Sequence, residues 1–88
     1  MQRAYVIISD SNGNELRRQE FTRPDTVIRD DGRSVEWERN EFDTATDAAR
    51  SVYKQEVERH RSHHAKGIMV QLIGHHGITV ERTIFNMQ

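Results

Sequence analysis

Residues 44–64 carry the apolar pattern of one amphipathic helix, and this pattern constrains the fold more than any other feature of the chain. Thr44 can cap the helix, with Asp47 three residues later at the spacing of a capping box. Gly67 follows as a stop signal. Because its first apolar residues are alanines, such a helix can lie close against a sheet. The apolar stripe consists of Ala45, Ala48, Ala49, Val52, Tyr53 and Val57.

The segments on both sides of this helix have strand-like sequences. Residues 3–9 are rich in β-branched side chains, and an Asn-Gly pair after them is typical of a hairpin turn. Residues 15–22 alternate poorly, which predicts an edge strand, whereas the mostly apolar 68–73 should be central. The order of elements predicts one α+β domain over residues 1–88, with an antiparallel sheet of four to six strands, hairpins before and after, packed against one long helix. The predicted strands are 3–9, 15–22, 26–29, 34–38, 68–73 and 78–85.

The chain contains no cysteine, so neither disulfides nor thiolate-bound zinc can stabilise it. Hydrophobic residues make up 34% and charged residues 31%, and the apolar ones are spread along the whole length, as in a folded chain. The first apolar run, which ends at Ile8, is too short for a signal peptide or a membrane span. We therefore expect a cytoplasmic protein with no cofactor and no membrane contact. The formal net charge of −1 supplies little attraction to DNA.

Acidic residues are concentrated between residues 30 and 47, where seven carboxylates stand against two arginines. Acids placed before a helix suit its dipole, which is the simpler interpretation. The alternative is a docking surface for an arginine-rich partner. Trp37, the only tryptophan, can pack beside Val35 in the core or serve as an interface anchor. The candidate interaction residues are Glu36, Trp37, Glu38, Glu41 and Asp43.

All five histidines fall between His60 and His76. His60 and His64 are four residues apart, a spacing that puts two imidazoles on one helix face and makes them candidate metal ligands. Zinc proteases use this spacing in a His-Glu-x-x-His helix, but Arg61 stands where the essential Glu would be, which argues against that enzyme. The alternative is that both imidazoles cover the boundary between core and solvent.

His75 and His76 belong to a predicted turn between Gly74 and Gly77. A strand at about 3.3 Å per residue would carry this turn about 20 Å from the end of the helix. The two histidine pairs should therefore not share one ion within a chain. We expect a solvated turn here, with a contact tip as the alternative.

The sequence lacks the motifs of common catalytic sites. No serine stands in a Gly-x-Ser-x-Gly elbow, and no Gly-Lys-Ser/Thr phosphate-binding run is present. We therefore expect a protein that is not an enzyme.

DNA binding by the exposed face of the sheet is an alternative function, since a small sheet backed by a helix can enter the major groove. The low net charge argues against it, because phosphate contacts dominate affinity. The residues that could line such a face are Arg17, Arg18, Arg29, Arg33 and Arg82.

The leading prediction is a small non-catalytic protein-interaction module that acts through the acidic segment. As a class, a cysteine-free α+β domain with polarised charge resembles accessory proteins of phages and mobile elements. Some of these, anti-CRISPR proteins among them, are inhibitors that occlude a nucleic-acid site on a host complex with acidic side chains. The resemblance covers no motif, and it implies another protein as partner, such as a nucleic-acid-binding complex. The alternatives are the DNA-binding domain, a histidine-based metal- or pH-responsive binding protein, and a homodimer paired through edge strands.

Overall fold

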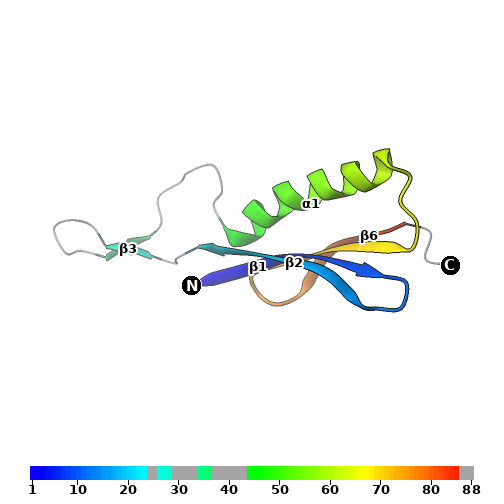
Figure 1. Cartoon of the computed structure of the whole chain (residues 1–88). Coiled ribbons are helices and arrows are strands. Elements are labelled where there is room, and N and C mark those ends of the chain that lie inside the picture. The colour runs from blue at the N-terminus through cyan, green and yellow to red at the C-terminus, as the bar shows by residue number, and fades with distance from the viewer. Residues whose placement is uncertain (24–25, 29–33, 37–43, 86–88) are drawn as a thin grey trace.

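The computed structural model describes residues 1–23, 26–28, 34–36 and 44–85, and of 26–28 and 34–36 it gives the backbone alone. Four strands form one antiparallel sheet in the order β2-β1-β5-β6. One helix, α1 (Ala45–Ser62), lies across one face of this sheet (Figure 1). The predicted α+β fold is confirmed. The strands of the sheet are β1 (Gln2–Asp10), β2 (Glu15–Arg23), β5 (Ile68–Ile73) and β6 (Thr79–Phe85).

Two further strands, β3 (Thr26–Ile28) and β4 (Ser34–Glu36), form a separate two-stranded sheet. Val27 lies opposite Val35 at the centre of this hairpin. Among the described residues, neither strand pairs with the four-stranded sheet. In Figure 1 the hairpin lies beyond the end of that sheet at which α1 begins. The expected second hairpin is therefore present, but it is not part of the main sheet.

The core lies between α1 and the two central strands. Val6 is paired with Leu72, and Ile8 with Val70, so that four apolar side chains form a compact block under the helix. Leu72 and Val70 are both 0% exposed. The central position predicted for 68–73 and the edge position predicted for 15–22 are both confirmed by the strand order. From the helix, the block is covered by Ala45, Ala49, Tyr53 and Val57.

The start of α1 is fixed by hydrogen bonds to its first turn. Thr44 has extended backbone angles, and its hydroxyl oxygen accepts from the Asp47 N–H at 3.0 Å, as expected of an N-cap. The Asp47 carboxylate forms an ion pair with Arg50 at 3.3 Å. Gln2 supplies a second acceptor, since its side-chain oxygen accepts from the Ala45 N–H at 3.0 Å. Strand β1 thus helps to hold the helix start in place.

The end of α1 differs from the predicted boundary at residue 64. The helix ends at Ser62, and His64 has a φ of 54°, in the left-handed region. The Ala65 N–H donates to the His60 carbonyl at 2.9 Å and the His64 N–H to the Arg61 carbonyl at 3.1 Å, which is the bonding pattern of a Schellman motif. The motif satisfies carbonyls at the end of the helix. The stop signal is therefore His64, three residues before the predicted Gly67.

Replacing His64 with glycine should stabilise the protein. A side chain in the left-handed region costs about 1 kcal/mol, and glycine avoids this cost. Urea denaturation followed by circular dichroism should show a free energy of unfolding raised by about 0.5–1 kcal/mol. His63→Gly is the matched control and should be destabilising, because His63 has a negative φ of −94°. Equal destabilisation by both substitutions would contradict this account of the helix end.

The turn between β1 and β2 is organised by one carboxylate. Asp10 Oδ1 accepts from the N–H groups of Asn12 and Asn14, each at 2.9 Å. Gly13 takes a φ of 82° in the same turn, as the Asn-Gly pair predicted. The hydrogen bond from the Asn14 N–H, and to a smaller extent that from the Asn12 N–H, holds the pKa of Asp10 below its ordinary value of 3.8.

The turn should therefore keep its structure until the pH falls below 3.8. Because the folded-state pKa is depressed, the contribution of Asp10 is complete above the unfolded value and is lost as the pH falls through the folded one. The amide shifts of Asn12 and Asn14, followed by NMR against pH, should titrate together with a midpoint below 3.8. Asp10→Asn should abolish this titration. A midpoint at or above 3.8 would contradict the hydrogen-bonded turn.

Within the part of the chain that the structure describes, no helix combines the length and the apolar character needed to cross a membrane.

Candidate functional site

The predicted interaction residues lie at the end of β4 and after it. Glu36 is the last residue of β4, where the backbone alone is described. Trp37, Glu38, Glu41 and Asp43 lie outside the described residues. The acidic docking surface therefore stays a prediction, and the structure adds the hairpin that leads into it.

The first histidine candidate, His60, lies at the rim of the core. Its Nδ1 donates to the Glu56 carbonyl at 2.8 Å, and its ring centroid is 6.1 Å from that of Phe85. His64 follows the helix rather than belonging to it, so the helical spacing behind the metal prediction does not extend to this residue. Among the described residues, no group of three or more His, Cys, Asp or Glu side chains is placed to hold a metal ion.

An open surface pocket of about 250 Å³ lies beside the last turn of α1, lined by Arg59, His60 and His63. His63 Nδ1 donates to the Arg59 carbonyl at 2.7 Å. Because a carbonyl can only accept, both imidazoles carry a proton on Nδ1, and a neutral ring keeps Nε2 as its acceptor. The Arg59 guanidinium is itself bound to Glu56 at 2.7 Å. The structure thus groups His60 with His63 rather than with His64.

The turn that holds the second histidine pair is tied to the first turn of α1. The His75 N–H donates to Thr46 Oγ1 at 2.9 Å, and His75 Nδ1 is 2.6 Å from the same oxygen (Thr46–His75 pair). The His76 ring lies 4.1 Å from the His75 ring. His75 is therefore a half-buried anchor rather than part of a fully solvated turn. The sequence carries no signal for this contact, because the two residues are 29 positions apart in the chain.

The two histidine pairs lie at opposite ends of the helix, as the strand length predicts. Thr46 belongs to the first turn of α1 and His60 to its last turn. Fourteen residues at a helical rise of about 1.5 Å separate them by about 21 Å. The pairs cannot share an ion within one chain.

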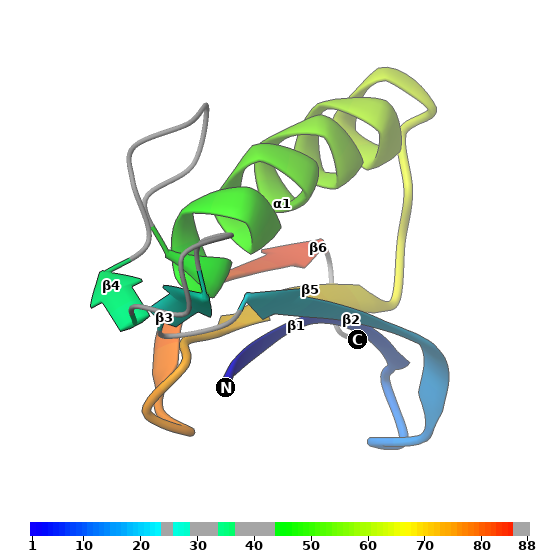
Figure 2. The same ribbon diagram turned by 90° about the vertical axis from the view of Figure 1, so that its left-hand side faces the viewer.

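Figure 2 shows α1 on one side of the four-stranded sheet, and among the described residues no other element covers the opposite side. Ile7 is 9% exposed although it is not a member of the core cluster, and Ile84 of β6 is 52% exposed. On β6, Thr83 and Phe85 rather than Ile84 share the face that packs against the helix. We refer to this surface as the uncovered face, which the strand alternation and register assign to Arg3, Tyr5, Ile7, Arg18, Glu20, Met69, Gln71, Ile73, Arg82 and Ile84.

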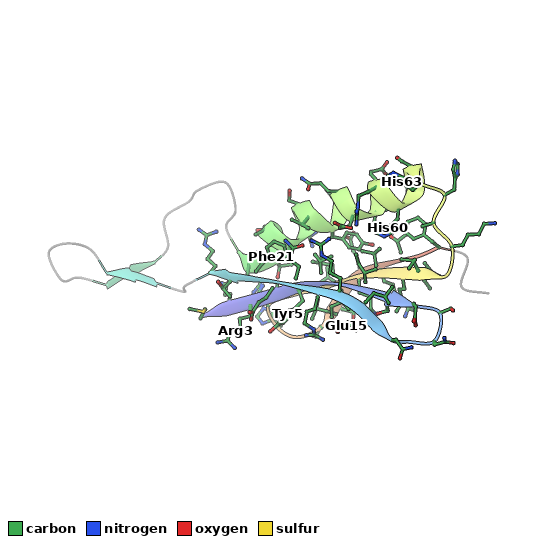
Figure 3. All side chains as sticks on the ribbon, in the orientation of Figure 1. Arg3, Tyr5, Glu15, Phe21, His60 and His63 are labelled. Carbon is green, nitrogen blue, oxygen red and sulfur yellow. The ribbon has the colours of Figure 1, made fainter. Side chains whose placement is uncertain are left out.

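On the uncovered face, Arg18 and Glu20 of β2 pair with neighbouring side chains, namely Glu15, Tyr5 and Arg3, which Figure 3 labels. Arg18 Nη2 is 2.7 Å from Glu15 Oε1, and its guanidinium lies 5.1 Å from the centre of the Tyr5 ring. The hydrogen bonds from Arg18 hold the pKa of Glu15 below its ordinary value. Glu20 accepts from the Tyr5 hydroxyl at 3.3 Å and lies 3.8 Å from Arg3. This cluster is an internally neutralised surface rather than a row of free cations.

The five arginines of the DNA-binding alternative do not lie on one face. Arg17 is 3.7 Å from Glu56 of α1 and therefore belongs to the side of the sheet that the helix covers. Arg18 and Arg82 are on the uncovered face. Arg29 and Arg33 lie outside the described residues. The placement of Arg17 corrects the predicted set, because neighbouring residues of a strand point to opposite faces.

The fold and these sites define a small α+β domain, and comparison with known proteins adds no closer assignment. No protein-family model matches the chain, and the searches of curated proteins and of solved structures found no match either.

Proposed function

We propose that this protein is a non-catalytic binding module, and that its partner is another protein with a basic surface. The observation that carries the proposal is the pairing of β3 and β4 with each other and, among the described strands, with no other. A two-stranded hairpin on its own is at best marginally stable in water. A hairpin with three-residue strands is therefore stabilised when the surface of a partner covers it.

The chemistry of the partner follows from the residues around this hairpin. Between residues 30 and 47 the sequence has seven carboxylates and two arginines. Such a segment attracts arginine-rich surfaces and repels acidic ones, which favours fast and selective association. Trp37 directly follows β4 and would serve as the apolar anchor at the centre of the contact.

The test is charge reversal in the acidic segment. Glu36, Glu38 and Glu41 are changed together to lysine, and partner recovery from a cell lysate is measured by quantitative mass spectrometry. Three such changes add six charges, which moves the formal net charge from −1 to +5. The partner should be lost, and a gradual rise in salt should release it from the unmodified protein.

A matched control separates the effect of where the charges are reversed from the effect of the total charge. Glu15, Glu20 and Glu58 are exposed acids of the described body, and changing them to lysine gives the same net charge. This control should retain the partner. Equal recovery by both triple variants, or equal loss, would sink the proposal that the hairpin and the acidic segment form the binding surface.

A further inference from the structure

The two edges of the four-stranded sheet differ in how well they are protected against pairing. Strand β2 carries five charged residues among its nine. Charged side chains are a usual means of blocking an edge. Strand β6 carries two charged residues among its seven. Within the part of the chain that the structure describes, no strand pairs with its outer side. The open edge is therefore β6.

The part of β6 that can pair regularly is centred on one residue. Leu72 lies opposite Glu81, but Ile73 lies opposite Thr79, so Val80 is an extra residue at a bulge. After the bulge the register runs without interruption to Phe85. The regular segment is thus Glu81–Phe85, and its middle residue is Thr83.

We propose that a second copy of this chain pairs antiparallel with β6, with the two-fold axis at Thr83. An axis at this position uses the whole regular segment of both copies. It places Glu81 opposite Phe85 of the second copy and Arg82 opposite Ile84. An axis at Glu81 or at Arg82 would instead set two identical charges directly opposite each other, which is destabilising. The extent of the regular segment and the avoidance of like charges therefore both favour an axis at Thr83.

On the side of the sheet that α1 covers, a hydrogen bond within each copy lies at the proposed axis. Tyr53 Oη is 2.7 Å from Thr83 Oγ1, so each copy brings a hydrogen-bonded Tyr–Thr pair to the centre. Threonines directly opposite each other form a favourable cross-strand pair. His60 packs against Phe85, and Phe85 faces Glu81 of the second copy. The assembly is an isologous dimer with one continuous eight-stranded sheet and both helices on the same side.

Two substitutions at one exposed position test the register. Ile84 is 52% exposed, so a charged residue there should leave the fold intact. In the proposed dimer, the two-fold axis places residue 84 of each copy opposite Arg82 of the other. Ile84→Glu therefore creates two attractive pairs, and Ile84→Lys creates two repulsive pairs. Sedimentation equilibrium between micromolar and millimolar protein should show a dimer whose dissociation constant is about fivefold lower for Ile84→Glu and at least about fivefold higher for Ile84→Lys.

Leu16 on the opposite edge supplies the control. It is 57% exposed, and Leu16→Glu and Leu16→Lys should leave the dissociation constant unchanged. A protein that stays monomeric at the highest concentration overturns the proposal. Equal weakening by both Ile84 variants overturns the register, because simple loss of apolar contact does not depend on the sign of the charge.

A second readout uses the absence of cysteine from the chain. Residues directly opposite each other have Cα atoms about 5 Å apart, within reach of a disulfide. Thr83→Cys should therefore form a covalent dimer under mild oxidation. Arg82→Cys should not, because its symmetry mate would lie about 8 Å away. Cross-linking of Arg82→Cys in preference to Thr83→Cys would also overturn the proposed axis.

Discussion

Replacing Leu72 with alanine should cost about 3 kcal/mol of the free energy of unfolding. Leu72 is 0% exposed and lies at the centre of the sheet under α1, where it belongs to the core cluster. Truncation removes buried methyl groups and leaves a cavity that the surrounding strands fill only in part. A domain of this size has a total stability of about 5–10 kcal/mol, so this loss is a large share of it.

Thermal unfolding followed by circular dichroism should show the effect of Leu72→Ala as a midpoint lowered by about 15 °C. The control is Ile78→Ala, since Ile78 is 68% exposed and its truncation should change stability by less than about 0.5 kcal/mol. All variants are compared at one protein concentration, because a dimer makes the midpoint depend on concentration. A similar loss in both variants would mean that the core does not lie between α1 and β5.

Enlarging Ala49 to leucine should destabilise the protein by about 2–3 kcal/mol. Ala49 is 0% exposed at the contact between α1 and the sheet, where its small side chain lets the helix lie close. Added methyl groups at this point must push the helix away or force strained rotamers. Gln55→Leu is the control, because Gln55 is an exposed residue of the same helix.

The measurement for Ala49→Leu is urea denaturation followed by circular dichroism. The midpoint should fall with the slope unchanged, which indicates a loss of stability rather than a change in compactness. Gln55→Leu should give a midpoint close to that of the unmodified protein. If Ala49→Leu proves neutral, the helix is not held against the sheet by the alanine contact.

The parts of the fold that depend on strong local signals could be predicted from the sequence. The helix was visible in the spacing of its apolar residues, and its start at Thr44 follows from capping chemistry. The first hairpin followed from the Asn-Gly pair, where Gly13 has the required positive φ. The central place of 68–73 followed from its apolar composition.

Other features depend on tertiary structure that local patterns do not contain. The sequence predicts a hairpin at 26–38 but does not say whether a third and a fourth strand join the main sheet. The bulge at Val80 changes which β6 residues share the helix-packed face, and a strict alternation cannot show this. His64 adopts a left-handed φ without being glycine, so the usual stop signal pointed to the wrong residue.

The candidate site was less predictable than the fold. The structure places His60 at the rim of the core beside Phe85, and its neighbour in the surface pocket is His63 rather than His64. The Thr46–His75 pair joins residues 29 positions apart, and such a contact has no signature in a single sequence. The acidic interaction residues remain a prediction that the charge-reversal experiment decides.

The β3–β4 hairpin lies in the chain between Arg23, where β2 ends, and Ala45, where α1 begins. Among the described strands, β3 and β4 pair only with each other, so lengthening or rewriting the hairpin requires no new register in the four-stranded sheet. Loops of this kind tolerate sequence change with little loss of stability. Under the proposed function, a change of sequence in the hairpin changes the choice of partner and leaves the core intact, and the same position in the chain is suited to the display of a foreign peptide.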